Sequence, residues 1–123
     1  MTDAADSINH FPIFSTAVEV ERHPAGAVIF SEGDSGTVLY VIRSGQVALQ
    51  IGGTTVETLG PDGMFGEMAL VDSSTRSATA VAESECELVP VDLSRFRRLV
   101  QDTPFFAERV MRVMAERLRR QTA

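Results

Sequence analysis

The sequence has few of the residues on which several protein classes depend. A single cysteine forms no internal disulfide, and the two histidines, His10 and His23, lack the spacing of metal ligands. No apolar run reaches the roughly 18 residues of a membrane-spanning helix. The N-terminus, "MTDAADSINHF", carries acids where a secretory signal carries positive charge. We therefore expect a cytoplasmic protein with no membrane contact, no metal and no cofactor.

Catalytic constellations are missing as well. No nucleophile stands in a pattern with a base, so we expect no enzyme. The one thiol, Cys86, lies in "CELVPV", where apolar residues alternate, which predicts a buried and unreactive side chain.

Positive charge is scarce over most of the chain. Residues 1–92 hold three arginines and carry a net charge of −11, whereas residues 93–123 hold eight arginines and carry +5. Such asymmetry can mark contact with a nucleic acid. The alternative, which we favour, is that arginine-rich helices dock on an acidic body and expose a solvated face.

A chain of 123 residues with 44% hydrophobic and 23% charged residues is typical of one globular domain. We divide it into an N-terminal segment (1–17), a β-barrel (18–92) and C-terminal helices (93–123). Short apolar stretches between glycines predict a sandwich or barrel, with a hairpin at Gly52-Gly53. The predicted strands are 18–22, 27–30, 38–45, 47–51, 54–59, 77–82 and 86–92.

Helical periodicity begins after Asp92, a candidate N-cap for a short helix. A longer helix is predicted to start at Pro104, with Thr103 as its cap. Heptad-like spacing and flanking apolar residues suggest two contacts for this helix, one to the barrel and one to another copy. The heptad-like positions are Ala107, Met111, Met114 and Leu118.

The stretch "PDGMFGEMALV" predicts a glycine-rich loop with a single helical turn, whose free amides can bind one small anion. Arg76, ten residues after Gly66, would add the positive charge and Ser77 a hydroxyl. Glu67 suits a sugar hydroxyl rather than a phosphate. The pattern favours a ligand that carries both a phosphate and a free sugar hydroxyl.

"FGEMAL", five residues, then "RSATAVA" resembles the phosphate-binding cassette of the cyclic-nucleotide-binding domain family, found in catabolite-activator-type regulators, cyclic-nucleotide-dependent kinases and gated channels. "HPAGAVIFSEGDSGTVLYVIRSGQVAL" is similar to the same family. The resemblance implies a mainly β fold, an eight-stranded jelly-roll barrel with a short loop helix and two C-terminal α-helices, here as a stand-alone domain.

The resemblance also implies a role for individual residues. Arg76 would bind the cyclic phosphate and Glu67 the ribose 2′-hydroxyl, with Ser77 near the phosphate or the base. Backbone amides of Gly66, Met68 and Ala69 would line the pocket. Met111, Met114 and Arg117 are candidates for a lid over the base, and Gly33, Gly45 and Gly66 would be turn glycines.

Two features depart from the family pattern. Thr75 stands where many members have proline, which predicts a less rigid loop and weaker binding. "FPIFSTAVEVE" leads almost directly into the first strand, so we expect a shortened N-terminal helical element.

These observations predict a regulatory sensor of cAMP or cGMP that signals through its C-terminal helices to an unknown protein partner or by self-association, for instance as a homodimer. The alternative is a ligand-free interaction module in which Arg76 and Glu67 pair with each other. A cupin-type enzyme would need metal ligands that the sequence lacks. Direct DNA binding is not expected, because no helix-turn-helix follows the long helix.

Overall fold

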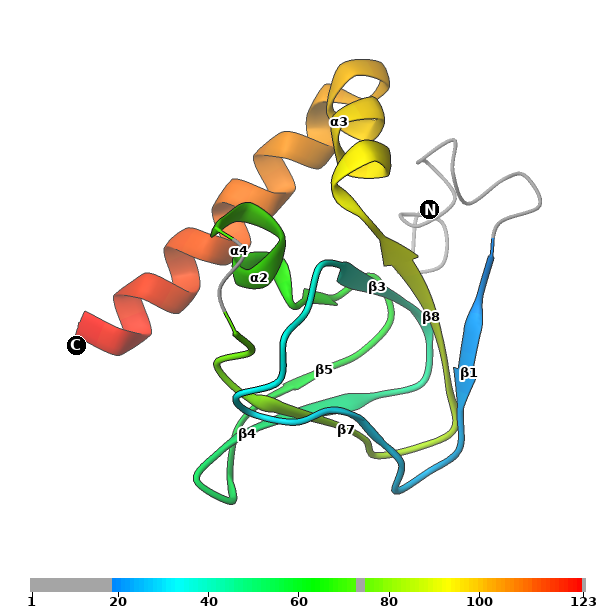
Figure 1. Cartoon of the computed structure of the whole chain (residues 1–123), viewed down its shortest axis with the longest axis vertical. Helices are drawn as coiled ribbons and strands as arrows, with labels where there is room; N and C mark the ends of the chain where they lie inside the picture. The colour runs from blue at the N-terminus through cyan, green and yellow to red at the C-terminus, as the bar shows by residue number, and fades with distance from the viewer. Residues whose placement is uncertain (1–18, 73–74, 123) are drawn as a thin grey trace, which may run out of the picture.

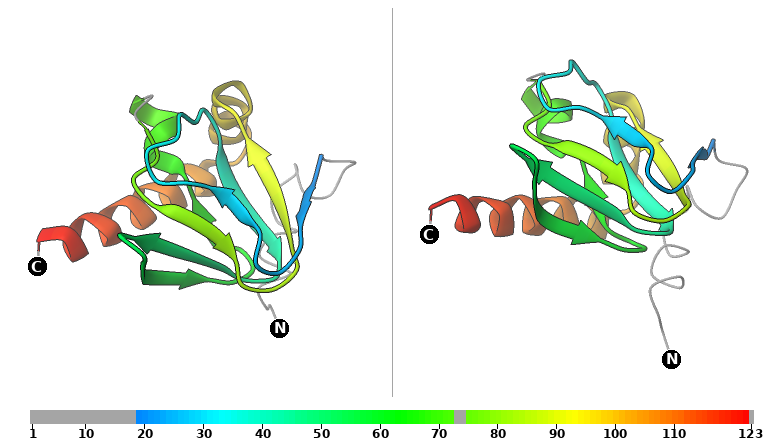
Figure 2. Two further views of the ribbon diagram at one scale, coloured as in Figure 1. Left: turned by 60° about the horizontal axis from the view of Figure 1, so that its bottom comes forward. Right: turned by 90° about the horizontal axis from the view of Figure 1, so that it is seen from below.

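The computed structural model describes residues 19–72 and 75–122, and these form two antiparallel sheets with helices at one side (Figure 1). The first sheet has the strand order β1-β8-β3-β6 and the second the order β2-β7-β4-β5. The strands are β1 (Glu21–His23), β2 (Val28–Phe30), β3 (Leu39–Ser44), β4 (Val47–Ile51), β5 (Thr54–Leu59), β6 (Met64–Phe65), β7 (Thr79–Ala82) and β8 (Cys86–Val91). The predicted mainly β, jelly-roll fold is confirmed, as two facing four-stranded sheets rather than a closed barrel (Figure 2).

Successive side chains of a strand point to opposite faces of its sheet, so the first sheet contributes to two hydrophobic cores, one beneath the helices and one between the sheets. On β3, Leu39 and Val41 face the helices, while Ile42 faces the second sheet. On β8, Val89 and Val91 again face the helices. Cys86 and Leu88 lie between the sheets, so the predicted burial of Cys86 is confirmed, and burial raises the pKa of its thiol.

The hairpin of β4 and β5 forms where it was predicted. Gly52 and Gly53 have φ of 58° and 83°, a conformation that glycine adopts without strain. Two strand predictions need correction. The first strand begins at Glu21 rather than at Val18, which lies outside the described residues, and β6 was not predicted, since its two residues are too few to show a period.

Three helices complete the described part of the chain: α2 (Glu67–Asp72), α3 (Leu93–Asp102) and α4 (Pro104–Thr122). Asp92 caps α3 as predicted, since its Oδ1 accepts the Arg95 amide at 2.8 Å. The prediction that Thr103 caps α4 is wrong for its side chain. The Thr103 hydroxyl is buried without a partner, and the backbone of this residue makes the contacts instead: its N–H donates to the Leu99 carbonyl and its carbonyl accepts from the Phe106 N–H.

The last helix packs on the first sheet by one face only. Phe106 and Val110 are buried beside α3, and Val113 and Met114 are partly buried against the same core. From there α4 runs past α2 to the C-terminus (Figure 1). Its course brings its last turns to the loop between β6 and β7, where the predicted binding residues lie.

Candidate functional site

A cavity of about 250 Å³ opens where α2, the hairpin of β4 and β5, and the end of α4 meet. Its size is close to the roughly 300 Å³ at which small-molecule pockets begin. Apolar residues form one wall, and charged residues from three elements face it. The lining residues are Leu49, Ile51, Val56, Glu57, Gly66, Glu67, Met68, Arg76, Ser77, Ala78, Arg117 and Arg120.

Arg76 is buried in the wall of this cavity, with only 6% of its surface exposed. Its Nη1 donates to the Gly66 carbonyl at 3.1 Å, and its guanidinium carbon lies 4.2 Å from the centre of the Phe30 ring. Its Nε has no hydrogen-bond partner. Within residues 19–72 and 75–122, no carboxylate lies within ion-pair distance of this guanidinium.

The backbone on both sides of Arg76 is held by the loop after β2. Gly33 N–H donates to the Arg76 carbonyl at 2.8 Å, and Arg76 N–H donates to the Asp34 carbonyl at 2.7 Å. Thr75 forms an isolated bridge with Ser35. These bonds restrain the backbone at Thr75, the position at which many members of the resembled family have proline.

Two glycines form a slot for the Arg76 side chain. A Cβ on Gly36 would lie 2.2 Å from Arg76 Nε, and one on Gly66 would lie 2.7 Å from Nη1. Gly66 also has a φ of 84°, as do Gly33 and Gly45 within a few degrees, which supports their prediction as turn glycines. The role of Gly36 was missed, because its contact partner lies 40 residues away in sequence.

Aromatic rings pack against the Arg76 guanidinium. Phe30, Tyr40 and Phe65 form a cluster with ring centroids 5.4 to 6.2 Å apart, and Arg76 stacks on Phe30. A cation held over a ring is stabilised by the negative face of that ring. Burial nonetheless lowers the pKa of Arg76. The side chain is therefore a desolvated cation with donors to spare.

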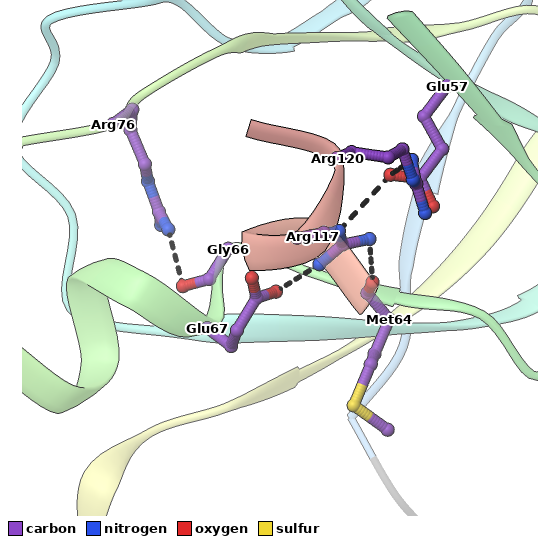
Figure 3. Close-up of polar contacts among 7 residues, drawn as sticks. All are labelled: Glu57, Met64, Gly66, Glu67, Arg76, Arg117 and Arg120. Atoms are coloured by element: carbon purple, nitrogen blue, oxygen red, sulfur yellow. Dashed lines mark hydrogen bonds and ion pairs between the residues drawn. The ribbon is translucent and has the colours of Figure 1, made fainter. Parts of the chain in front are cut away.

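Glu67, 3% exposed, begins α2 and pairs with the last helix rather than with Arg76. Arg117 Nη1 donates to Glu67 Oε1 at 2.5 Å. The same guanidinium donates from Nε to Glu57 at 3.1 Å and from Nη2 to the Met64 carbonyl at 2.8 Å (Figure 3). Arg120 joins Glu57 at 3.0 Å. The ion pair of Arg76 with Glu67 that a ligand-free module would use is absent from the described residues.

The model of the cyclic nucleotide-binding domain matches residues 20–103. The chain belongs to this family. The cyclic AMP receptor protein of Thermus thermophilus is 39% identical over 102 residues, which cover 79% of this chain and 47% of that protein. A cAMP-dependent protein kinase regulatory subunit of Yarrowia lipolytica is 34% identical over 86 residues, covering 70% of this chain and 23% of the subunit.

Solved structures agree with the sequence comparison. The crystal structure of the Thermus thermophilus catabolite activator protein matches with a TM-score of 0.74 at 37% identity, over 85% of this chain and 51% of that one. The chain thus spans about half the length of the regulators that it matches. It is a cyclic nucleotide-binding domain homologous to such regulators and to kinase regulatory subunits.

The structure brings most of the predicted site residues of this domain to one cavity. Gly66, Glu67, Met68, Arg76, Ser77 and Arg117 all line it. Ala69 belongs to α2, but its side chain lies outside the described residues. The other two lid candidates do not line the cavity: Met111 is 61% exposed, and Met114, one helical turn before Arg117, packs against the core beneath the helices.

Sequence reasoning missed Glu57, which lies in β5 among residues with a plain strand pattern. The arginine-rich helix does dock on acidic residues of the β region, as favoured. Arg109 pairs with Asp62, and Arg117 and Arg120 pair with Glu57. Burial opposes the charge on Arg117, but Glu67 and Glu57 together raise its pKa.

Two further findings concern the described residues. None of the helices in residues 19–72 and 75–122 combines the length and the apolar character needed to cross a membrane. In the same residues, no three His, Cys, Asp or Glu side chains gather as metal ligands would. The predicted N-terminal element and His10 lie outside the described residues.

Proposed function

We propose that this chain is a cytoplasmic sensor domain that binds cAMP or cGMP in the cavity beside Arg76. The observation that carries the proposal is the state of that arginine. It is buried, has no carboxylate partner among the described residues, and keeps an unsatisfied Nε. A buried cation with unused donors is costly unless an anion completes it, and a phosphodiester offers one charge and two acceptor oxygens.

The remaining lining residues suit the other parts of a cyclic nucleotide. Glu67 provides a carboxylate for the ribose 2′-hydroxyl, and Ser77 adds a hydroxyl beside Arg76. The backbone amides of Gly66, which precedes α2, and of Met68 and Ala69 in its first turn lie at the same place. Leu49, Ile51 and Val56 form an apolar wall against which a purine can pack.

The output element in this proposal is α4. Its C-terminal turns touch the cavity through Arg117 and Arg120, while its first turns pack on the core through Phe106. A ligand that changes the cavity therefore changes the surface on which α4 rests. The proposed sensor is one domain, composed of an N-terminal segment (1–17), the β region (18–92) and the C-terminal helices (93–123). Its unknown partner in this proposal is a protein that contacts α4.

A second copy of the chain is the partner that α4 itself suggests. Met111 and Leu118 are 61% and 57% exposed and stand seven residues apart, at two of the four heptad-like positions of α4; Met114, at a third, packs against the core of its own chain. Sedimentation of the parent and of Met111→Glu checks this point. We expect a dimer for the parent and a monomer for the variant, and a monomeric parent contradicts self-association.

Titration calorimetry on protein stripped of nucleotide tests the proposed function. We expect cAMP or cGMP to bind, linear AMP to bind much more weakly, and Arg76→Ala to lose about 2–5 kcal/mol, roughly 30-fold to several thousand-fold. Equal affinities for cyclic and linear nucleotide indicate a nonspecific anion site. No heat from any of the three nucleotides favours the ligand-free interaction module.

A further inference from the structure

The turn between β5 and β6 contains a strained residue that contacts α4 outside the nucleotide cavity. Within residues 19–72 and 75–122, Asp62 is the one residue other than glycine with a positive φ, which is 76°. We propose that Asp62 is a positioning residue, which holds the first half of α4 against this turn through Arg109. The inference does not depend on the proposed function, because neither residue lines the nucleotide cavity.

The first support is the cost of the backbone conformation at this position. The left-handed region strains a residue that has a side chain, although aspartate tolerates it better than most, and glycine adopts it freely. The turn imposes this conformation, since Asp62 N–H donates to the Ile42 carbonyl and Ile42 N–H donates to the Gly63 carbonyl, both at 2.8 Å. A carboxylate at a position that suits glycine better indicates that the carboxylate has a use.

The second support is the double contact that Arg109 makes. Its Nη2 forms an ion pair with Asp62 Oδ2 and also donates to the carbonyl of the same residue at 3.0 Å. One guanidinium thus contacts both the side chain and the backbone of the strained residue. Arg109 lies in the second turn of α4, and the Asp62 side chain is only 9% exposed. An ion pair that is partly shielded from solvent is screened less than an exposed one, so this contact can hold the helix.

The third support is that apolar packing beneath this part of the helix is incomplete. A second cavity of about 100 Å³ lies between α4 and the β region, and Val113 lines it together with Asp62 and Arg109. Side chains next to a void lose the contacts through which a packed surface holds a helix. Arg109 bonds to the Asp62 carbonyl at this void. Further along α4, Arg117 bonds to the Met64 carbonyl, two residues on in the same segment. The position of this part of α4 therefore depends on polar contacts.

Hydrogen exchange and urea denaturation of the full chain without ligand test the assignment. Asp62→Gly removes the carboxylate together with the strain, whereas Asp62→Ala removes the carboxylate and keeps the strain. We expect amide exchange in residues 106–116 to become roughly tenfold faster in both variants, as the loss of a hydrogen bond to a charged group predicts. We also expect Asp62→Gly to unfold at a higher urea concentration than Asp62→Ala, because only the second keeps the strain.

The two readouts separate positioning from general stability. If Asp62 acts only on stability, exchange in α4 follows the urea midpoint and differs between the two variants, which overturns the assignment. Exchange at the parent rate in Asp62→Gly also overturns it. The matched control is Arg112→Gln, which removes an arginine from an exposed pair with Glu108 on the same helix and should keep the parent rate.

A variant of the partner residue completes the test. Arg109→Gln should accelerate exchange in the same residues, and combining it with Asp62→Gly should add little, because both changes remove one contact. Additive effects mean that the two residues act independently, and contradict the proposal. If Asp62→Ala does not fold, Asp62→Asn replaces it, since asparagine tolerates the left-handed conformation and carries no charge. Exchange in Asp62→Asn should again be faster than in the parent, and an unchanged rate contradicts the assignment.

Discussion

A partly buried arginine, Arg117, and a buried one, Arg76, line one cavity and are held in different ways. Arg117 is surrounded by acceptors, with two carboxylates and one carbonyl around a single guanidinium. Arg76 has one carbonyl, an aromatic ring and two glycines, and its Nε has no partner. The first arginine is satisfied by the protein and therefore stabilises the fold. The second is left incomplete, which is the state expected of a residue whose partner is a ligand.

Replacing each arginine by methionine turns this comparison into a stability measurement. Arg117→Met leaves Glu67 without its cation and leaves Glu57 with Arg120 alone, so we expect a loss of about 3 kcal/mol, the low end for breaking a buried ion pair. Arg76→Met loses one bond to a carbonyl and removes an unsatisfied donor, so we expect a change within about 1 kcal/mol. Urea denaturation of the ligand-free proteins measures both values. Equal losses would mean that the protein itself completes Arg76.

The glycine slot of Arg76 can be closed without touching the arginine. Gly36→Ala puts a Cβ 2.2 Å from Nε, and the guanidinium has to move. We expect nucleotide affinity to fall by roughly fivefold to 150-fold, taking the about 1–3 kcal/mol of such overpacking as the loss at the phosphate contact. Gly60→Ala is the control, because nothing lies within 4 Å of its added Cβ. Calorimetry on both variants checks the point, and an unchanged affinity in Gly36→Ala refutes the slot.

The dependence of stability on pH tests the ion pairs at the Arg117 end of the cavity. Burial acts to raise the pKa of Glu57, but the hydrogen bonds from Arg117 and Arg120 prevail and hold it below its ordinary value of 4.5. A carboxyl whose pKa is lowered on folding stabilises the protein above its unfolded pKa, and this contribution is lost as the pH falls through the folded pKa.

We therefore expect the free energy of unfolding of the parent to exceed that of Glu57→Gln at neutral pH, and the gap to narrow below about pH 4.5. Denaturation of the two proteins across this range measures the gap. A constant difference from neutral to acid pH would show that the ion pairs of Glu57 contribute nothing.

The smallest effect on stability is expected for Arg112, which does not line the cavity. Arg112 pairs with Glu108 across one helical turn at 3.8 Å, and their side chains are 71% and 67% exposed. Exposed pairs at this spacing contribute about 0.3–0.5 kcal/mol. Thermal denaturation of Arg112→Gln should match the parent within that amount and lose the remaining difference in high salt. A larger loss would mean that Arg112 has a further partner.

Local elements were predicted closely where their causes lie within a few residues. β4 and β5 match the predicted ranges because alternation and the Gly52-Gly53 turn act between neighbours. Asp92 caps α3 for the same reason. Thr103 was misjudged, because a residue that serves two helices at once is governed by the packing of both.

The candidate site was predicted in part. Arg76 and Glu67 stood out because basic residues are scarce around them and the loop is rich in glycine. The pairing of Glu67 with Arg117, across 50 residues, was not predictable, since helix spacing does not state which loop a helix face will meet. Gly36, Phe30 and Glu57 were missed for the same reason, as each contacts the site from a distant segment.

The sequence by itself determined seven of the eight strands, the β4–β5 turn, the two C-terminal helices and a lone arginine beside a glycine-rich loop, because each follows from the spacing of neighbouring residues. The tertiary structure decided which arginine is satisfied and which is not. That distinction depends on the carboxylates that packing places around each guanidinium, and charge attraction acts through space, whatever the order of residues along the chain.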